Sequence, residues 1–264
     1  MTSKNIAKMT LAAGAVAIVA NKASAATDQA AVDTAIKSLK TYDWGADIKS
    51  LKPIEQAVID TQKDKAARAK LEKALADMLA SGISRSAQDF VCRRLRIIGT
   101  TQSVKALAAL LTNEESSDIA RYALGDIDDA SAVDALRAAL PKVSAKLKPG
   151  IIGSLGGRGD TKSVAAIAKL LGDADTNIAK ASAKALALIA TPDAAKALCA
   201  FSTKAPAAVK IAAADACLIC ADNMLACGKK ADAIAIYKGL KGDDQPKHVK
   251  VAAMKGMLTA ASKK

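Results

Sequence analysis

The chain has 264 residues, of which 51% are hydrophobic but only 2% aromatic, because alanine supplies much of the apolar content. Alanine has the highest helix propensity and lets helices approach closely, so this composition favours an all-helical fold over a mixed sheet. The formal net charge of +13 indicates anionic partners, since such a field attracts them.

The first 25 residues have the pattern of a secretory signal peptide. Lys4 and Lys8 precede an apolar run over residues 9–20, and Ala23-Ser24-Ala25 supplies small residues at a cleavage site. Twelve apolar residues are too few to cross a membrane, which takes roughly 20 in a helix, so an uncleaved anchor is the weaker alternative. We therefore expect an exported protein, periplasmic or secreted, with no membrane span after cleavage. Loss of the three lysines of the leader would lower the net charge from +13 to +10.

Residues 26–80 lack the repeat that follows them and are predicted to form a helical end cap. Helices are expected over residues 28–39 and 53–80, joined by a link that contains Trp44. A solenoid needs such a cap to shield its first apolar face. Trp44 belongs either to this shield or to an exposed anchor for a partner, since tryptophan is enriched among binding hot spots.

Residues 81–264 are built on a repeat of about thirty residues. Val104, Val133, Val164 and Ala195 occupy equivalent positions, at spacings of 29, 31 and 31 residues. Around each of them apolar residues recur at i, i+3, i+4 and i+7, as on one face of a helix. These segments are predicted to be the second helices of pairs, whose first helices are expected over residues 86–98, 117–126, 144–155, 177–190 and 207–227. The period predicts an α-solenoid of antiparallel helix pairs.

One repeat carries a recognisable motif. Tyr122-Ala-Leu-Gly-Asp126 ends a first helix at a turn, and Ala132-Val-Asp-Ala-Leu136 opens the second. The pattern resembles the HEAT-repeat family in its short bacterial form, over about residues 86–264. The resemblance implies a protein-binding scaffold whose second helices line the inner surface. The exposed positions there would be Lys105, Asp134, Arg137, Lys169 and Lys196, a mostly basic set.

The cysteines suggest a metal or redox role. Cys217, Cys220, Met224 and Cys227 share one stripe of a predicted helix, and thiols with a thioether can bind Cu(I). A buried core face of small apolar residues has the same pattern, and we interpret the stripe as core. Helix geometry separates Cys217 from Cys227 too far for a bridge, so the disulfide to test joins Cys199 to Cys217 or Cys220.

Other motifs lack the partners that their chemistry requires. Residues 156–163 are similar to a phosphate-binding loop, but Thr161 replaces the last glycine and no strand is expected before it. His248 is the only histidine, and neither a Ser-His-Asp set nor an HExxH helix can be built around it. We predict no catalytic residue, no metal ligand and no cofactor.

The sequence thus predicts a non-enzymatic exported scaffold that binds a protein partner. One alternative is an accessory protein that binds acidic polysaccharide or an envelope surface, and a second is a thiol- or copper-binding protein. Nucleic acid is not expected, because the leader directs export and stacking aromatics are few. The one compact basic cluster comprises Arg93, Arg94 and Arg96, and the remaining basic residues are interpreted as solvated helix faces.

Overall fold

A computed structural model describes residues 28–242 and 245–262, so the predicted leader lies outside the described residues. The described part consists of α-helices and short 3₁₀ turns, without strands. The α-helices are α1 (Gln29–Ser38), α2 (Lys52–Asp60), α3 (Lys65–Leu79), α4 (Arg85–Ile98), α5 (Thr101–Ala109), α6 (Ser117–Leu124), α7 (Ala130–Ala139), α8 (Lys148–Gly157), α9 (Val164–Lys169), α10 (Thr176–Ile189), α11 (Pro192–Ser202), α12 (Ala207–Ala226), α13 (Lys230–Gly239) and α14 (Lys247–Ser262). The 3₁₀ turns are η1 (Ile48–Leu51), η2 (Thr61–Lys63), η3 (Thr161–Ser163) and η4 (Leu170–Gly172).

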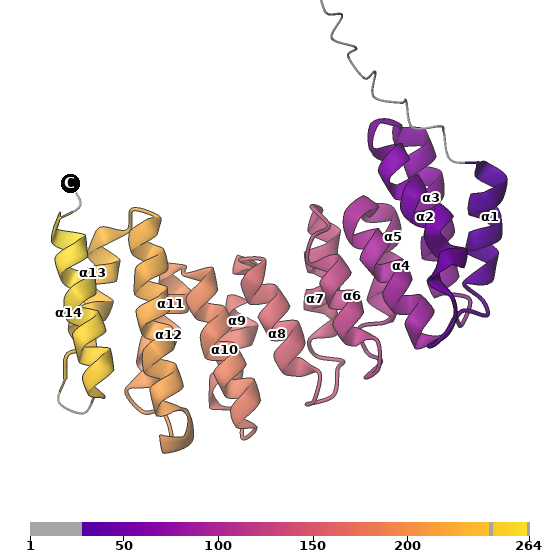
Figure 1. Cartoon of the computed structure of the whole chain (residues 1–264). Helices are drawn as coiled ribbons and strands as arrows, with labels where there is room; N and C mark the ends of the chain where they lie inside the picture. Colours follow the sequence, from indigo (N-terminus) through magenta and orange to yellow (C-terminus); the bar gives the residue numbers. More distant parts are fainter. Residues whose placement is uncertain (1–27, 243–244, 263–264) are drawn as a thin grey trace, which may run out of the picture.

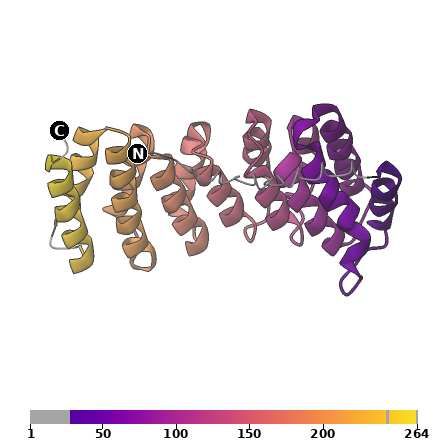
Figure 2. The ribbon, with the colours of Figure 1, turned by 45° about the horizontal axis from the view of Figure 1, so that its top comes forward.

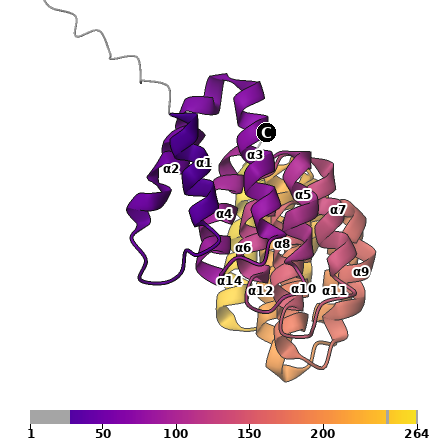
Figure 3. The same cartoon turned by 90° about the vertical axis from the view of Figure 1, so that its right-hand side faces the viewer.

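The helices form one elongated row, which runs in sequence order from α1 at one end to α14 at the other (Figures 1 and 2). The helices of successive pairs alternate between two layers. Seen along the row, α5, α7, α9 and α11 lie on one side and α4 and α6 on the other (Figure 3). Within the layers α4 contacts α6, α5 contacts α7, and α10 contacts both α8 and α12. This translational order confirms the predicted all-α, HEAT-like solenoid.

The repeat positions form the core between the layers. Leu107, Leu136, Ile167 and Leu198 hold the same register in α5, α7, α9 and α11, and each is fully buried. Burying a leucine or isoleucine side chain contributes about 1.5–3 kcal/mol. Because each pair buries this face only against its neighbours, the stability of one repeat depends on the repeats beside it.

The end region differs from its prediction in one respect. The prediction of one helix over residues 53–80 is wrong, because the α-helix is interrupted between α2 and α3. Thr61 Oγ1 donates to the carbonyl of Ala57 at 2.7 Å and ends the first helix. The carboxylate of Asp64 accepts the backbone N–H groups of Ala66 and Ala67, both at 3.0 Å, and so starts the second as an N-cap. Helix α3 then contacts α4 and α5, which extends the layer of second helices by one member.

The first helix expected over residues 144–155 begins later, at Lys148. Pro149 stands in its first turn, where a helix needs no backbone donor.

Arginine side chains join successive repeats at the ends of the first helices. Arg68 of α3 donates to the carbonyls of Ile97 and Ile98, at 2.9 and 3.2 Å. Arg158, which follows α8, donates to the carbonyl of Gly125 at 2.9 Å. Carbonyls at the C-terminal end of a helix lack partners within it and carry a partial negative charge. Part of the positive charge of the chain therefore stabilises the contacts between repeats.

Candidate functional site

A groove lies between the link that follows α1 and the outer face of α4. Its volume is about 450 Å³. We call it the Trp44 groove, and its lining residues are Tyr42, Trp44, Ile48, Arg85, Ser86, Asp89, Phe90, Arg93 and Arg94.

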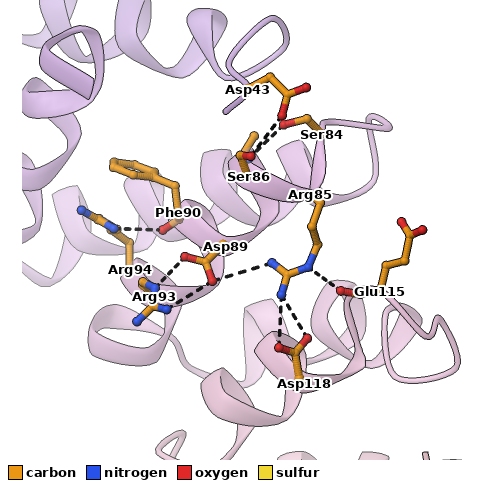
Figure 4. Close-up of polar contacts among 11 residues, drawn as sticks. Asp43, Ser84, Arg85, Ser86, Asp89, Phe90, Arg93, Arg94, Glu115 and Asp118 are labelled. Carbon is orange, nitrogen blue, oxygen red and sulfur yellow. Dashed lines mark hydrogen bonds and ion pairs between the residues drawn. The ribbon is translucent and has the colours of Figure 1, made fainter. Parts of the chain in front are cut away.

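Hydrogen bonds hold the link against the start of α4 (Figure 4). Ser84 caps α4 by accepting the N–H of Ala87 at 3.1 Å, and its hydroxyl donates to the carbonyl of Tyr42 at 2.6 Å. The carboxylate of Asp43 accepts the backbone N–H of Trp44 at 2.8 Å and the hydroxyl of Ser86 at 3.0 Å. These two bonds lower the pKa of Asp43 below its ordinary value, and the bond from the backbone of Trp44 has the larger effect. The backbone at Trp44 is therefore fixed by its neighbours on α4.

The groove has a buried aromatic floor and an exposed apolar rim. Phe90 is 4% exposed, and its ring centroid lies 6.4 Å from that of the half-buried Tyr42. On the rim, Trp44 is 90% exposed and Ile48 is 50% exposed. Trp44 thus shields no apolar face within the described residues. This exposure argues against the interpretation of Trp44 as part of the shield, and its role as an anchor for a partner stays a prediction.

The arginines of the groove are held by acidic groups (Figure 4). Arg85 reaches across to α6, where its guanidinium lies 3.1 Å from a carboxylate oxygen of Asp118, and it also donates to the carbonyl of Glu115. Arg93 donates to Asp89 on its own helix at 2.6 Å. Its pKa is raised by this bond to Asp89. The groove therefore presents paired charges rather than an open basic patch.

Arg94 connects the groove to the end region. Its guanidinium carbon lies 3.6 Å from the centroid of the Phe90 ring, and it forms an ion pair with Glu55 of α2. Burial lowers the pKa of Arg94, and the carboxylate of Glu55 opposes this shift. A cation stacked on an aromatic face stabilises both groups, so Arg94 fixes the orientation of the floor.

The third arginine of the predicted basic cluster points elsewhere. Arg96 forms an ion pair with Asp126 and donates to the hydroxyl of Tyr122. Its guanidinium carbon lies 4.4 Å from the centroid of the Tyr122 ring, and that of Arg93 lies 5.5 Å from the same ring. The cluster that is contiguous in sequence thus joins α4 to α6 and to α2.

The predicted binding row lies on the layer of second helices. Three of its members, one each on α5, α9 and α11, have exposed side chains: Lys105, Lys169 and Lys196. The other two, Asp134 and Arg137, pair with each other at 2.6 Å. Arg137 also donates to both carboxylate oxygens of Asp160, at 2.9 and 2.8 Å, and Asp160 is buried. Arg137 is thus engaged in contacts within the fold, and the role of the lysines stays a prediction.

The cysteine stripe on α12 is mainly core. Cys217, Cys220 and Met224 are buried. Cys227, in contrast, is exposed at the end of the helix, so the interpretation as core is wrong for this residue. All five cysteines are free thiols, and Cys199 lies against Cys217. Among the residues that the structure describes, no group of three or more His, Cys, Asp or Glu side chains could hold a metal ion.

The remaining motifs are also placed. His248 is exposed at the start of α14, with Nε2 3.5 Å from a carboxylate oxygen of Asp215. Gly156 lies inside α8 rather than in a loop, and Asp160 directs its carboxylate into the structure. Residues 156–163 thus comprise the end of α8 and the connection to α9, which includes η3.

Sequence reasoning identified Trp44 but missed the rest of its groove. Tyr42 and Ile48 belong to a link without periodicity, and Phe90 reads as one more apolar residue of an amphipathic helix. Only their meeting in space marks them, and no spacing in the sequence encodes it.

Comparison with known proteins bears on the solenoid rather than on the groove. Residues 134–217 match a protein family described as HEAT repeats. The matched range extends from α7 into α12 and supports the resemblance drawn from the sequence motif. HEAT repeats commonly act as scaffolds for protein interaction. No curated protein matches the chain. Within the described residues, every helix is too short or too polar to cross a membrane.

Proposed function

We propose that this protein is a non-enzymatic, exported scaffold that binds a protein partner, and that the partner inserts an apolar side chain into the Trp44 groove. The observation that carries the proposal is the 90% exposure of Trp44 above a buried aromatic floor. Tryptophan, tyrosine and arginine dominate binding hot spots, and an exposed large apolar side chain at the rim of a groove is typical of a docking site.

The rigidity of the link favours tight docking. The backbone of Trp44 is bonded to Asp43, which is itself bonded to Ser86 on α4. A contact that is ordered before binding loses less conformational entropy when the partner arrives. Most of the free energy released when the indole ring is buried therefore contributes to binding.

The charge balance of the groove favours a protein over an acidic polysaccharide. Arg85 and Arg93 both face Asp89, at 3.7 and 2.6 Å. An acidic chain would have to compete with these carboxylates, whereas an apolar side chain would leave the pairs intact. The arginines then supply polar groups beside the apolar surface of Trp44, Ile48 and Phe90, and a combination of apolar centre and polar surroundings is the usual anatomy of a protein interface.

Trp44 is the only tryptophan of the chain, so its fluorescence reports directly on the groove. The experiment compares proteins captured from the envelope fraction of the source cells by the wild type, by Trp44→Ala and by the control Leu258→Ala. Leu258 is 72% exposed on α14, at the opposite end of the solenoid. We expect a partner that binds the wild type and the control, is lost from Trp44→Ala, and shifts the tryptophan emission to shorter wavelength. A partner that binds Trp44→Ala as well as wild type would contradict the proposal.

Salt dependence separates this function from glycan binding. Exposed charge contacts are screened over about 8 Å at physiological ionic strength, so a charge-led glycan contact would weaken steeply as salt is added. Binding through the groove should change little over the same range. Reversing the exposed charges of Lys105, Lys169 and Lys196 together tests the row on the second helices in the same assay. Loss of the partner on this reversal, with Trp44→Ala unaffected, would move the site from the groove to that layer.

Export is a separate part of the proposal and rests on the leader pattern. N-terminal sequencing of the protein from the envelope of its own cells should begin at Ala26. A mature protein that begins at Met1 or Thr2 would refute cleavage.

A further inference from the structure

A second cavity lies near the other end of the solenoid, between α11, α12 and α13. Its volume is about 360 Å³, and two thiols face it, from Cys199 on α11 and Cys217 on α12. The cavity does not touch the Trp44 groove, so an inference drawn from it is independent of the proposed function.

The two thiols differ in access. Cys199 is half-buried, whereas Cys217 is 1% exposed. Each is in contact with the other across the packed pair α11 and α12. A reagent that enters the cavity thus reaches Cys199 first and finds Cys217 behind it.

The contact between the thiols also makes them unequal as acids. The neighbouring Cys217 thiol lowers the pKa of Cys199, and burial opposes this shift. The same contact, together with burial, raises the pKa of Cys217. Since the thiolate is the nucleophile, Cys199 is the reactive member of the pair.

The remaining cysteines lack one or other of these properties. Burial raises the pKa of both Cys92 and Cys220 to about 12, and neither lines the cavity. Cys227 is exposed at the end of α12 but does not face the cavity.

We propose that Cys199 and Cys217 are a redox pair that forms a disulfide by exchange with a small disulfide such as oxidised glutathione. The Cys199 thiolate attacks one sulfur of the oxidant, whose S–S bond breaks and releases one thiolate. The Cys217 sulfur, as it loses its proton, then attacks the Cys199 sulfur of the mixed disulfide and expels the second thiol. The two protein thiols are oxidised, the small disulfide is reduced to two thiols, and the cavity accommodates the mixed disulfide between the steps.

The bond would change the solenoid locally. It would tie the second helix of one pair to the first helix of the next across the turn at residues 203–206. A disulfide that closes the loop from Cys199 to Cys217 restricts the unfolded chain, and it thereby raises the stability of the two repeats that it joins. The redox state of the surroundings would then set the rigidity of the C-terminal repeats.

The experiment uses the full chain, reduced and then equilibrated in buffers with increasing ratios of oxidised to reduced glutathione. Remaining thiols are alkylated, and tryptic peptides are analysed by mass spectrometry. Trypsin releases residues 197–204 and 211–229, so the bond appears as these two peptides joined, and fragmentation assigns it to Cys217. We expect two of the five thiols to escape alkylation. We also expect the oxidised protein to have a higher midpoint of thermal unfolding than the reduced protein.

Variants separate the two steps. Cys217→Ala should stop at the mixed disulfide and carry glutathione on Cys199, whereas Cys199→Ala should leave Cys217 unmodified. Cys227→Ser is the matched control on the same helix and should form the bond as wild type does. Five alkylated thiols in the most oxidising buffer, or a bond to Cys220 or Cys227 instead, would overturn the assignment. Because wild-type mapping is decisive by itself, a variant that misfolds leaves the test intact.

Discussion

Replacing Glu72 by alanine should lower the free energy of unfolding more than any other exchange of a single acidic residue on α3. Glu72 is 1% exposed, and its carboxylate lies over the first turn of α5. It accepts the backbone N–H and hydroxyl of Thr100, at 2.6 and 2.9 Å, and those of Ser103, at 3.2 and 2.8 Å. One side chain therefore joins the end region to the first repeat.

The magnitude follows from what each donor can do once the carboxylate is gone. Thr100 is exposed, so water can replace its bonds. The N–H and hydroxyl of Ser103 retain a second acceptor, the carbonyl of Thr100, at 3.1 and 3.2 Å. No donor is then left wholly without a partner, and the main loss is that of bonds to a charged acceptor, each contributing about 1.5–3 kcal/mol. Part of this loss is recovered by the weaker replacement bonds. With the lost attraction to the helix dipole, worth about 0.3–1 kcal/mol, we expect a net loss of about 2–3 kcal/mol.

Urea unfolding followed by circular dichroism measures the change. Glu72→Gln keeps the shape of the side chain but has only one accepting oxygen. Its free energy of unfolding should therefore lie between those of the wild type and Glu72→Ala. The control is Asp77→Ala on the same helix, where an exposed carboxylate pairs with Lys73 at 2.8 Å and should contribute less than about 0.5 kcal/mol. The reasoning is refuted if Glu72→Ala stays within 0.5 kcal/mol of wild type or if the control loses as much.

Two further predictions concern glycines of α8 and a buried acid. A Cβ added at Gly156 would lie 2.6 Å from the Cα of Ala185 on α10, so Gly156→Ala should destabilise by about 1–3 kcal/mol despite its higher helix propensity. The same exchange at Gly153, where nothing lies within 4 Å, should stabilise by about 0.5–1 kcal/mol, and equal urea midpoints for the two variants would contradict this account. Burial raises the pKa of Asp160, but hydrogen bonds from Arg137 and Ser163 together bring it below its ordinary value. Its stabilisation is therefore present at neutral pH and lost as the pH falls below about 4, so the gap in unfolding free energy between wild type and Asp160→Asn should narrow in acid, and a gap that widens would show the opposite sign.

The register of the repeats could be predicted from the sequence because it depends on local chemistry. A helix face is encoded every three to four residues, and each pair of a solenoid buries that face against adjacent pairs only. The leucines and isoleucine at residues 107, 136, 167 and 198 are fully buried for this reason. Even the break after α2 has a local signal in Asp64, an N-cap residue that the continuous apolar pattern concealed.

The partners of charged side chains could not be predicted in the same way. Arg137 reads as an exposed cation of a binding face, yet its carboxylate partner Asp160 comes from the turn before the next second helix, 23 residues away. Arg93, Arg94 and Arg96 read as one basic patch, yet they pair with acids on α4, on α2 and just after the end of α6. Such pairs depend on how neighbouring repeats are rotated against each other, which is a property of the packed array.

By itself, the sequence determined the helices, their two-layer order and the positions of the core, since these follow from short-range periodicity. The two candidate sites, the Trp44 groove and the thiol pair, depend on the packing of the helices. The tertiary structure set Trp44 at the rim of a groove floored by Phe90, 46 residues later, and it placed Cys199 against Cys217 rather than Cys220. The groove arises where segments distant in the chain meet, and the thiol pair arises where two consecutive helices pack. In both cases the relative position of the side chains is fixed only when the buried faces pack together.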